Sequence, residues 1–200
     1  MVLTASTMLP LGEPLPFTAI QTAQAAGQLE QLAGRPLDLA ALQGKPLLVL
    51  FLCAHCPFVK HIEPELTRLQ HDLAGTDLAW LAISSNSTST HPQDGPEGLR
   101  QQAERCGWRF PYQHDREQQL AIAFRAACTP DLFLFNREHR LAYRGQLDAS
   151  RPGNDQPLNG RDLRDAIAAV LAGLEPARPQ QPSIGCNIKW HPGREPAWAR

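Results

Sequence analysis

Cys53 and Cys56 are separated by two residues and form the part of the sequence best suited to chemistry. Two thiols at this spacing can close into a disulfide and open again by thiol–disulfide exchange. His55 lies between them, and an imidazole near sulfur stabilises a thiolate. Cysteine and histidine also bind zinc and copper. A metal site formed by the two cysteines with His55 or His61 is therefore an alternative. A structural zinc site usually has a second ligand pair, and none follows at matching spacing, so redox chemistry is favoured.

The flanking residues predict how the two cysteines are held. An unbroken apolar run, Leu47–Leu52, precedes them and is typical of a strand buried on both faces of a sheet. After Pro57, apolar residues recur at the spacing of one helix face, at Phe58, Val59, Ile62, Leu66, Leu69 and Leu73. The pair therefore sits at a strand-to-helix junction, where unpaired helix N–H groups stabilise a thiolate.

Composition limits the class of protein. The formal net charge of −1 gives no reason to expect nucleic acid or an anionic membrane as a partner. The 5 cysteines are odd in number and widely spread, which favours chemistry over structural disulfides. Residues 1–15 lack a basic start before an apolar core, and no run has the length of a membrane span. We therefore expect a soluble cytoplasmic protein.

The rest of the chain divides into three parts. Residues 1–36, rich in proline, alanine and glutamine, predict a loosely structured lead-in with a short hairpin near residues 17–20. Residues 37–173 carry the strand and helix patterns of a single domain. Residues 174–200 contain five prolines, which predict an irregular tail, and its tryptophans indicate that the tail packs on the domain.

Within the domain, Leu78–Ile83 predicts a second strand, followed by a polar loop at residues 84–94 where open sheets usually place functional residues. A helix then begins near Asp94 and ends at Gly107. A strand hairpin follows at residues 132–144, and a last helix spans about residues 163–173.

Three motifs resemble the peroxiredoxin-like branch of the thioredoxin superfamily, of the alkyl hydroperoxide reductase and thiol-specific antioxidant type. They are Phe51–Lys60, Cys128–Asp131 and Pro182–Trp190. The resemblance implies a thioredoxin-like α/β fold, with a central mixed sheet flanked by helices. It also implies that the Thr129–Pro130 peptide is cis and faces the cysteine pair, with Pro130 shaping the substrate groove.

The resemblance assigns roles to the cysteines in two ways. In thioredoxin-like exchange the first cysteine attacks and the second resolves, which assigns attack to Cys53 and resolution to Cys56. In peroxiredoxins the attacking cysteine lies where Cys56 is, three residues after a threonine or serine. Here that position is Cys53, so the hydroxyl that orients a peroxide is missing. An arginine beside the thiolate is also expected, and Arg125 is the nearest candidate in sequence.

The other cysteines have weaker signals. Cys128 lies two residues before Pro130, so it is either a third redox thiol near Cys53 and Cys56 or a small packing residue. Cys106 fits the inward face of a helix and is expected to be inert. Cys186 is better explained as a buried small residue of the tail than as a mobile resolving cysteine.

Together these features predict a thiol–disulfide oxidoreductase with an antioxidant or redox-homeostasis role. It would use no bound cofactor and no metal, and would exchange electrons with dithiol or disulfide proteins. One alternative is a peroxidase acting on small hydroperoxides through Cys56. Others are a copper- or zinc-binding chaperone and a redox-inert interaction module. No feature of the sequence indicates an oligomeric state.

The position of His55 yields a first prediction. Replacing it with alanine removes a group that stabilises the thiolate and hence the reduced protein, so the reduction potential of the cysteine pair should fall. Equilibration with a dithiol buffer of known potential measures this, and an unchanged potential would contradict the tuning role.

Overall fold

The computed structural model describes residues 3–199 and is organised around β3 (Leu47–Phe51), all of whose residues are buried. Its parallel neighbour is β4 (Ala79–Ser84), and its antiparallel neighbour is β7 (Asp131–Phe135). A strand without polar side chains is stable only inside a sheet covered on both faces. The two strands that the sequence predicted here are therefore confirmed as adjacent parallel strands.

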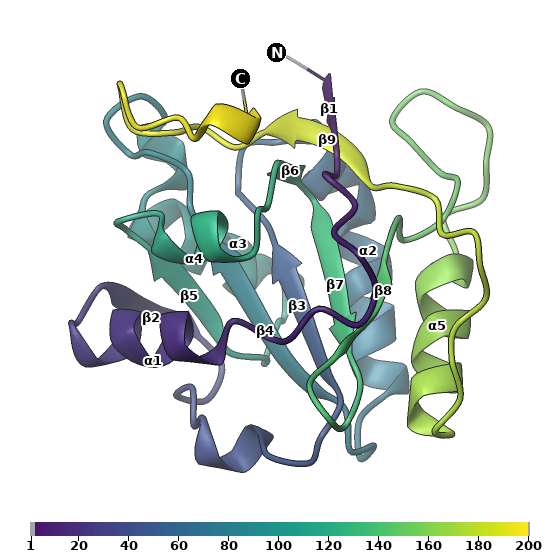
Figure 1. Cartoon of the computed structure of the whole chain (residues 1–200). Helices are drawn as coiled ribbons and strands as arrows, with labels where there is room; N and C mark the ends of the chain where they lie inside the picture. Colours follow the sequence, from purple (N-terminus) through teal and green to yellow (C-terminus); the bar gives the residue numbers. More distant parts are fainter. Residues whose placement is uncertain (1–2, 200) are drawn as a thin grey trace.

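The central sheet has six strands in the order β2-β5-β4-β3-β7-β8 (Figure 1). The outer members are β2 (Leu29–Ala33), β5 (Tyr112–Asp115) and β8 (Leu141–Arg144). β3, β4 and β5 run parallel, whereas β2, β7 and β8 pair antiparallel with their neighbours. The predicted mixed sheet and the hairpin between β7 and β8 are confirmed.

Helices cover both faces of this sheet (Figure 1). One face packs against α2 (Pro57–Asp72), α3 (Pro96–Cys106) and α5 (Arg161–Leu171), and the other against α1 (Phe17–Ala25) and α4 (Gln119–Ala123). Alternate residues of β3 enter the two cores, because successive side chains of a strand point to opposite faces. Short 3-10 turns span Ala40–Leu42, Pro92–Asp94 and Ala197–Ala199. No helix within residues 3–199 is long and apolar enough to cross a membrane.

The N-terminal segment differs from its prediction. Residues 17–20 belong to α1 rather than to a hairpin, and β2 adds an edge strand to the sheet by pairing antiparallel with β5. Ile20 and Ala23 are buried, and they anchor the helix although most of its other side chains are polar or small. The expectation of a loosely structured lead-in is wrong for these residues because the pairing that orders them is long-range.

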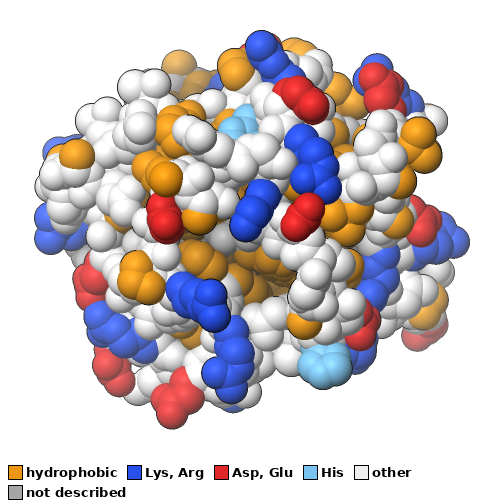
Figure 2. Space-filling view, turned by 90° about the horizontal axis from the view of Figure 1, so that it is seen from below, with side chains coloured by type: hydrophobic (Ala, Val, Ile, Leu, Met, Phe, Trp, Pro, Cys, Tyr) orange, Lys and Arg blue, Asp and Glu red, His pale blue; other side chains and the backbone are white. Residues whose placement is uncertain are grey.

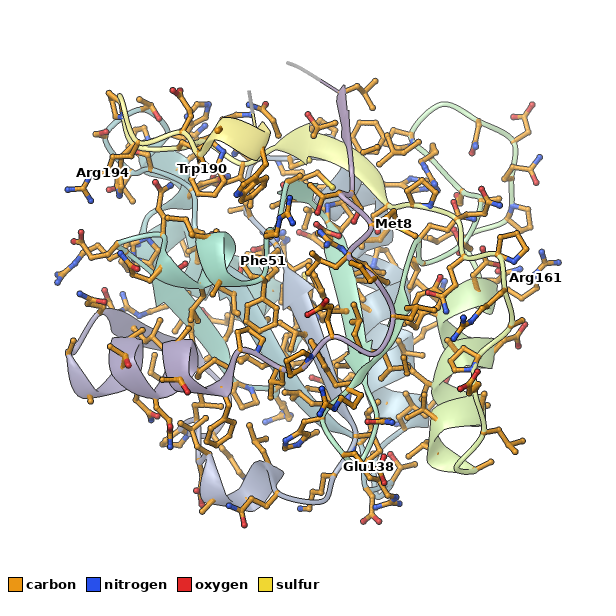
Figure 3. All side chains as sticks on the ribbon, in the orientation of Figure 1. Met8, Phe51, Glu138, Arg161, Trp190 and Arg194 are labelled. Atoms are coloured by element: carbon orange, nitrogen blue, oxygen red, sulfur yellow. The ribbon has the colours of Figure 1, made fainter. Side chains whose placement is uncertain are left out.

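The C-terminal segment also contains regular structure that the sequence did not predict. β9 (Ile184–Asn187) lies between β1 (Leu3–Ala5) and β6 (Cys128–Thr129), so strands from three distant parts of the chain form a second sheet. Residues 183–191 contain no proline, which leaves their N–H groups free to pair. Trp190, labelled in Figure 3, is buried beside α4. Its ring contacts that of Trp198 edge-on, with centroids 5.8 Å apart.

Gly185 fixes β9 against the turn after β6. A Cβ atom at this position would lie 2.0 Å from the Thr129 carbonyl oxygen and 3.1 Å from Pro130 Cδ. Only glycine permits so close an approach of two backbones.

We therefore expect Gly185→Ala to separate β9 from β6 and to lower the free energy of unfolding by about 1–3 kcal/mol, as overpacking does elsewhere. Urea unfolding and amide exchange at β9 measure the effect. Ile184→Ala is the matched control, since its side chain is 37% exposed and its loss should change little. Equal stability of the two variants would contradict this account.

Candidate active site

Cys53 and Cys56 lie between the carboxyl end of β3 and the start of α2, at the edge of the sheet that β9 crosses (Figure 1). Cys56 is the N-cap residue of α2, and Pro57 is its first residue, where a missing N–H costs nothing. All five cysteines are free thiols, and the side chains of Cys53 and Cys56 are fully buried. The sequence thus placed the pair at the correct junction.

Thr129 contacts both sulfurs. Its hydroxyl oxygen lies 3.2 Å from Cys53 Sγ. Its carbonyl oxygen lies 3.2 Å from Cys56 Sγ and accepts a hydrogen bond from it while Cys56 is protonated. The Thr129–Pro130 peptide is cis, as the resemblance implied. These four residues, Cys53, Cys56, Thr129 and Pro130, are called the cysteine site below.

Asp94 holds the loop between the two cysteines, and the sequence did not identify it as a site residue. Its Oδ1 accepts hydrogen bonds from the Ala54 and His55 N–H groups, at 2.9 and 3.0 Å. Its Oδ2 lies 2.5 Å from His55 Nδ1 and accepts a bond from the Asn86 amide at 2.7 Å. Burial raises the pKa of Asp94, but the hydrogen bonds from His55 and Asn86 outweigh it and hold the pKa below its ordinary value.

His55 is thereby fixed beside Cys53. One ring nitrogen of His55, one Asp94 oxygen and Cys53 Sγ all lie within 4.8 Å of one another. His91, to which the sequence assigned no role, lies against the His55 ring with centroids 5.0 Å apart. Burial and the neighbouring His55 lower the pKa of His91, so His91 favours its neutral form there.

The two thiols have opposite electrostatic environments. The pKa of Cys56 is lowered to about 5, chiefly by a hydrogen bond from the Cys53 thiol. Weaker hydrogen bonds come from the Cys186 thiol and from the Val59 and Cys186 N–H groups. Together they outweigh burial, which acts to raise this pKa. Burial, the Cys56 sulfur and the Asp94 carboxylate raise the pKa of Cys53 well above its ordinary value. The structure therefore favours Cys56 as the thiolate, the reverse of the order in which the sequence assigned attack.

The remaining candidates lie around this centre. Cys128 Sγ donates to the Pro130 carbonyl at 3.5 Å, and burial together with Asp131 raises the pKa of Cys128 well above its ordinary value. The predicted arginine, Arg125, stacks over Trp198 at 5.8 Å rather than on a cysteine. The fully buried Arg144 pairs with the equally buried Asp131 at 3.1 Å, which anchors the residue after Pro130.

A metal ion has one candidate ligand set here, formed by Cys53, His55 and Asp94. Their sulfur, nitrogen and oxygen atoms suit zinc or copper. Both Asp94 oxygens, however, already accept two hydrogen bonds each, and His55 Nδ1 uses one of them. A metal would have to replace these bonds, so the arrangement fits a hydrogen-bonded loop better than a metal centre.

A large hollow on the surface lies away from the cysteines. It measures about 730 Å³ and is lined by residues that include Leu37, Leu73, Trp80 and Phe110, between the C-terminal end of α2 and the start of β4. Figure 2 views the lower end of the molecule and shows an apolar hollow bordered by lysine and arginine. None of the residues that line this hollow belongs to the cysteine site.

The environment of Cys56 predicts its titration. In Cys53→Ser a hydroxyl still donates to Cys56, so thiolate ultraviolet absorbance should be lost only as the pH falls through about 5. Cys53→Ala removes this donor and should raise the midpoint. The double variant Cys53→Ser/Cys56→Ser gives the baseline. A Cys56 midpoint near the ordinary value of about 8.5 would contradict the assignment.

Comparison with known proteins agrees with this geometry. The model of the AhpC/TSA family matches residues 20–144. An uncharacterized conserved protein from Geobacillus kaustophilus shares 38% identity at a TM-score of 0.84, covering 96% of this chain and 98% of that chain. A hypothetical protein from Sinorhizobium meliloti 1021 shares 38% identity at a TM-score of 0.82, covering 95% of this chain and all of that chain (100%).

More distant structures share the fold alone. A thiol-disulfide isomerase from Corynebacterium glutamicum is 18% identical at a TM-score of 0.53, covering 74% of this chain and 92% of that chain. The comparison with curated proteins gave no match. The predicted thioredoxin-like fold is confirmed. Since the family model spans more than half of the chain, the chain belongs to the AhpC/TSA family of thioredoxin-fold thiol oxidoreductases.

Proposed function

We propose that the protein is a thiol–disulfide oxidoreductase that alternates between a Cys53–Cys56 dithiol and the corresponding disulfide. The observation that carries the proposal is the contact of both sulfurs with Thr129, together with the stabilised thiolate at Cys56. Its partners are dithiol or disulfide proteins, and a cytoplasmic location with an antioxidant or redox-homeostasis role accompanies the proposal.

The first step is attack by the Cys56 thiolate on one sulfur of a partner disulfide. The partner S–S bond breaks, a Cys56–partner disulfide forms, and the other partner sulfur leaves as a thiolate. Hydrogen bonds from the Cys53 and Cys186 side chains and from the Val59 and Cys186 N–H groups hold the attacking sulfur in its ionised form. This proposal exchanges the roles that the sequence assigned to Cys53 and Cys56.

The second step releases the partner. Cys53 loses its proton and attacks Cys56 Sγ, so the Cys53–Cys56 disulfide forms and the partner leaves reduced. His55, held within 4.8 Å of Cys53 Sγ by Asp94, is the base to which we assign that proton. Reduction by another dithiol then restores the starting state, and every step is reversible.

A peroxidase is the second candidate, and the lowered pKa of Cys56 favours it as well. A Cys56 thiolate would attack a hydroperoxide oxygen, release water or an alcohol and become a sulfenic acid, which Cys53 would convert to a disulfide with loss of water. The threonine expected three residues before Cys56 is replaced by Cys53, and the Thr129 hydroxyl contacts Cys53 rather than Cys56.

Single-turnover reactions of the reduced protein test both candidates, with a small aromatic disulfide in one arm and hydrogen peroxide in the other. Cys56→Ser should abolish reaction in either arm because the thiolate is lost. Cys53→Ser should react with the disulfide, release the partner more slowly than wild type and accumulate the mixed disulfide. Cys106→Ser is the matched control and should leave the rate unchanged, since the pKa of Cys106 is raised to about 11 by burial and Glu63.

Three outcomes separate the candidates. Disulfide reduction without peroxide consumption supports the oxidoreductase. Peroxide consumption faster than that of a free thiol, lost with Cys56→Ser, supports the peroxidase. Full activity of Cys56→Ser in both arms would overturn both assignments.

A further inference from the structure

Cys186 lies directly opposite Thr129 in the antiparallel pairing of β9 with β6. It is therefore paired with the residue whose hydroxyl and carbonyl groups contact Cys53 and Cys56. Cys186 is 1% exposed and belongs to the same apolar core as both of these cysteines. The close approach of Gly185 to the Thr129 carbonyl holds this strand in place, so the position of Cys186 is fixed by two backbones.

The pairing of Cys186 with Thr129, whose carbonyl oxygen lies 3.2 Å from Cys56 Sγ, brings Cys186 beside Cys56. The Cys186 thiol and N–H group lower the pKa of Cys56, whereas Cys186 is not among the causes of the Cys53 shift. Burial and the Cys56 thiolate raise the pKa of Cys186 to about 12, so it is a proton donor while the pair is reduced. β9 packs against α2, which carries Cys56 at its N-cap. Cys56 is thus influenced by two thiols, Cys53 and Cys186.

We propose that Cys186 is a third redox thiol of the cysteine site, which forms a disulfide with Cys56 in place of Cys53. This rests on the proposed Cys53–Cys56 disulfide and deepens it. A buried thiol on a strand paired with Thr129 needs no excursion of the tail to reach its partner, unlike the mobile resolving cysteine that the sequence left as an alternative.

The exchange balances without an external oxidant. In the oxidised protein Cys186 loses its proton and attacks Cys56 Sγ. The Cys56–Cys186 bond forms, the Cys53–Cys56 bond breaks, and Cys53 leaves as a thiolate that takes up a proton. Once Cys56 is in a disulfide it has no negative charge, so the part of the Cys186 pKa shift that is due to the Cys56 thiolate disappears. Oxidation of the pair therefore makes Cys186 a better nucleophile.

The other two cysteines do not compete for this role. Cys128 Sγ is bonded to the Pro130 carbonyl, and the largest charged influences on it are Asp131 and Arg144 rather than a cysteine. Cys106 is at the end of α3, where its charged neighbours are Glu63 and Arg105. Cys128 is nevertheless a matched control, because it is buried, lies in the same small sheet and pairs with the next residue of β9, Asn187.

The test traps disulfides in the full chain. Wild type, Cys53→Ser, Cys53→Ser/Cys128→Ser and Cys53→Ser/Cys186→Ser are reduced and freed of reductant. They are then treated with diamide, a two-electron thiol oxidant, quenched in acid, alkylated and mapped by peptide mass spectrometry. We expect a Cys56–Cys186 disulfide in Cys53→Ser and in Cys53→Ser/Cys128→Ser, and its loss in Cys53→Ser/Cys186→Ser. In oxidised wild type, a fraction of chains should carry this disulfide with Cys53 alkylated.

Two results would overturn the proposal. One is a Cys53→Ser protein that has a wild-type circular dichroism spectrum and forms no disulfide, or forms one between Cys56 and Cys128. The other is an oxidised wild-type protein in which Cys186 is always recovered alkylated, a measurement that needs no variant to fold. If wild type forms no Cys53–Cys56 disulfide but Cys53→Ser still joins Cys56 to Cys186, the proposed function fails and the role of Cys186 stands.

Discussion

Segments of the chain that are distant in sequence meet at Thr129. Its hydroxyl contacts Cys53, its carbonyl oxygen lies 3.2 Å from the Cys56 sulfur, and its backbone pairs with Cys186. Each of these residues reaches Thr129 from a different element, namely the end of β3, the start of α2 and β9. The buried pair of Asp131 and Arg144 fixes the residue after Pro130, so the turn cannot shift without leaving a charge unpaired in the core. The relative positions of the Cys53, Cys56 and Cys186 sulfurs therefore depend on this one residue.

The environments of the two cysteines differ although only two residues separate them. Cys56 is at a helix N-terminus and is surrounded by donors, whereas Cys53 faces the Asp94 carboxylate. Asp94 has two effects, because it holds His55 beside Cys53 and also disfavours negative charge on Cys53. This division suits a pair in which one sulfur is ionised at rest and the other is ionised only after a proton has been removed from it.

The sequence correctly predicted the strands and helices that follow from short-range residue patterns. The apolar run of β3, the helix periodicity after Pro57 and the hairpin of β7 and β8 all appear where the patterns placed them. It did not predict β2 or β9, because each is ordered by pairing with a strand that lies about 60 or more residues away in the chain, as in Leu29 with Asp115 and Thr129 with Cys186.

The same reason explains which site residues were missed. Asp94 acts on His55 across the polar loop after β4, which the sequence identified as a functional region without identifying the residue. Cys186 contacts Cys56 only because β9 pairs with β6. Residues whose role depends on a long-range contact have no signature in the spacing of their neighbours, so the position of the pair was predictable and its surroundings were not.

The zero exposure of both sulfurs has a kinetic consequence. An external disulfide or peroxide reaches them only when the structure around them opens, so each turnover includes an opening step that precedes chemistry. When that step is slow, the rate reaches a ceiling as the oxidant concentration rises, and the ceiling is the opening frequency rather than the reactivity of sulfur. The turnover rate would then be set by how often the site opens, and any contact that loosens the C-terminal strand would raise this rate.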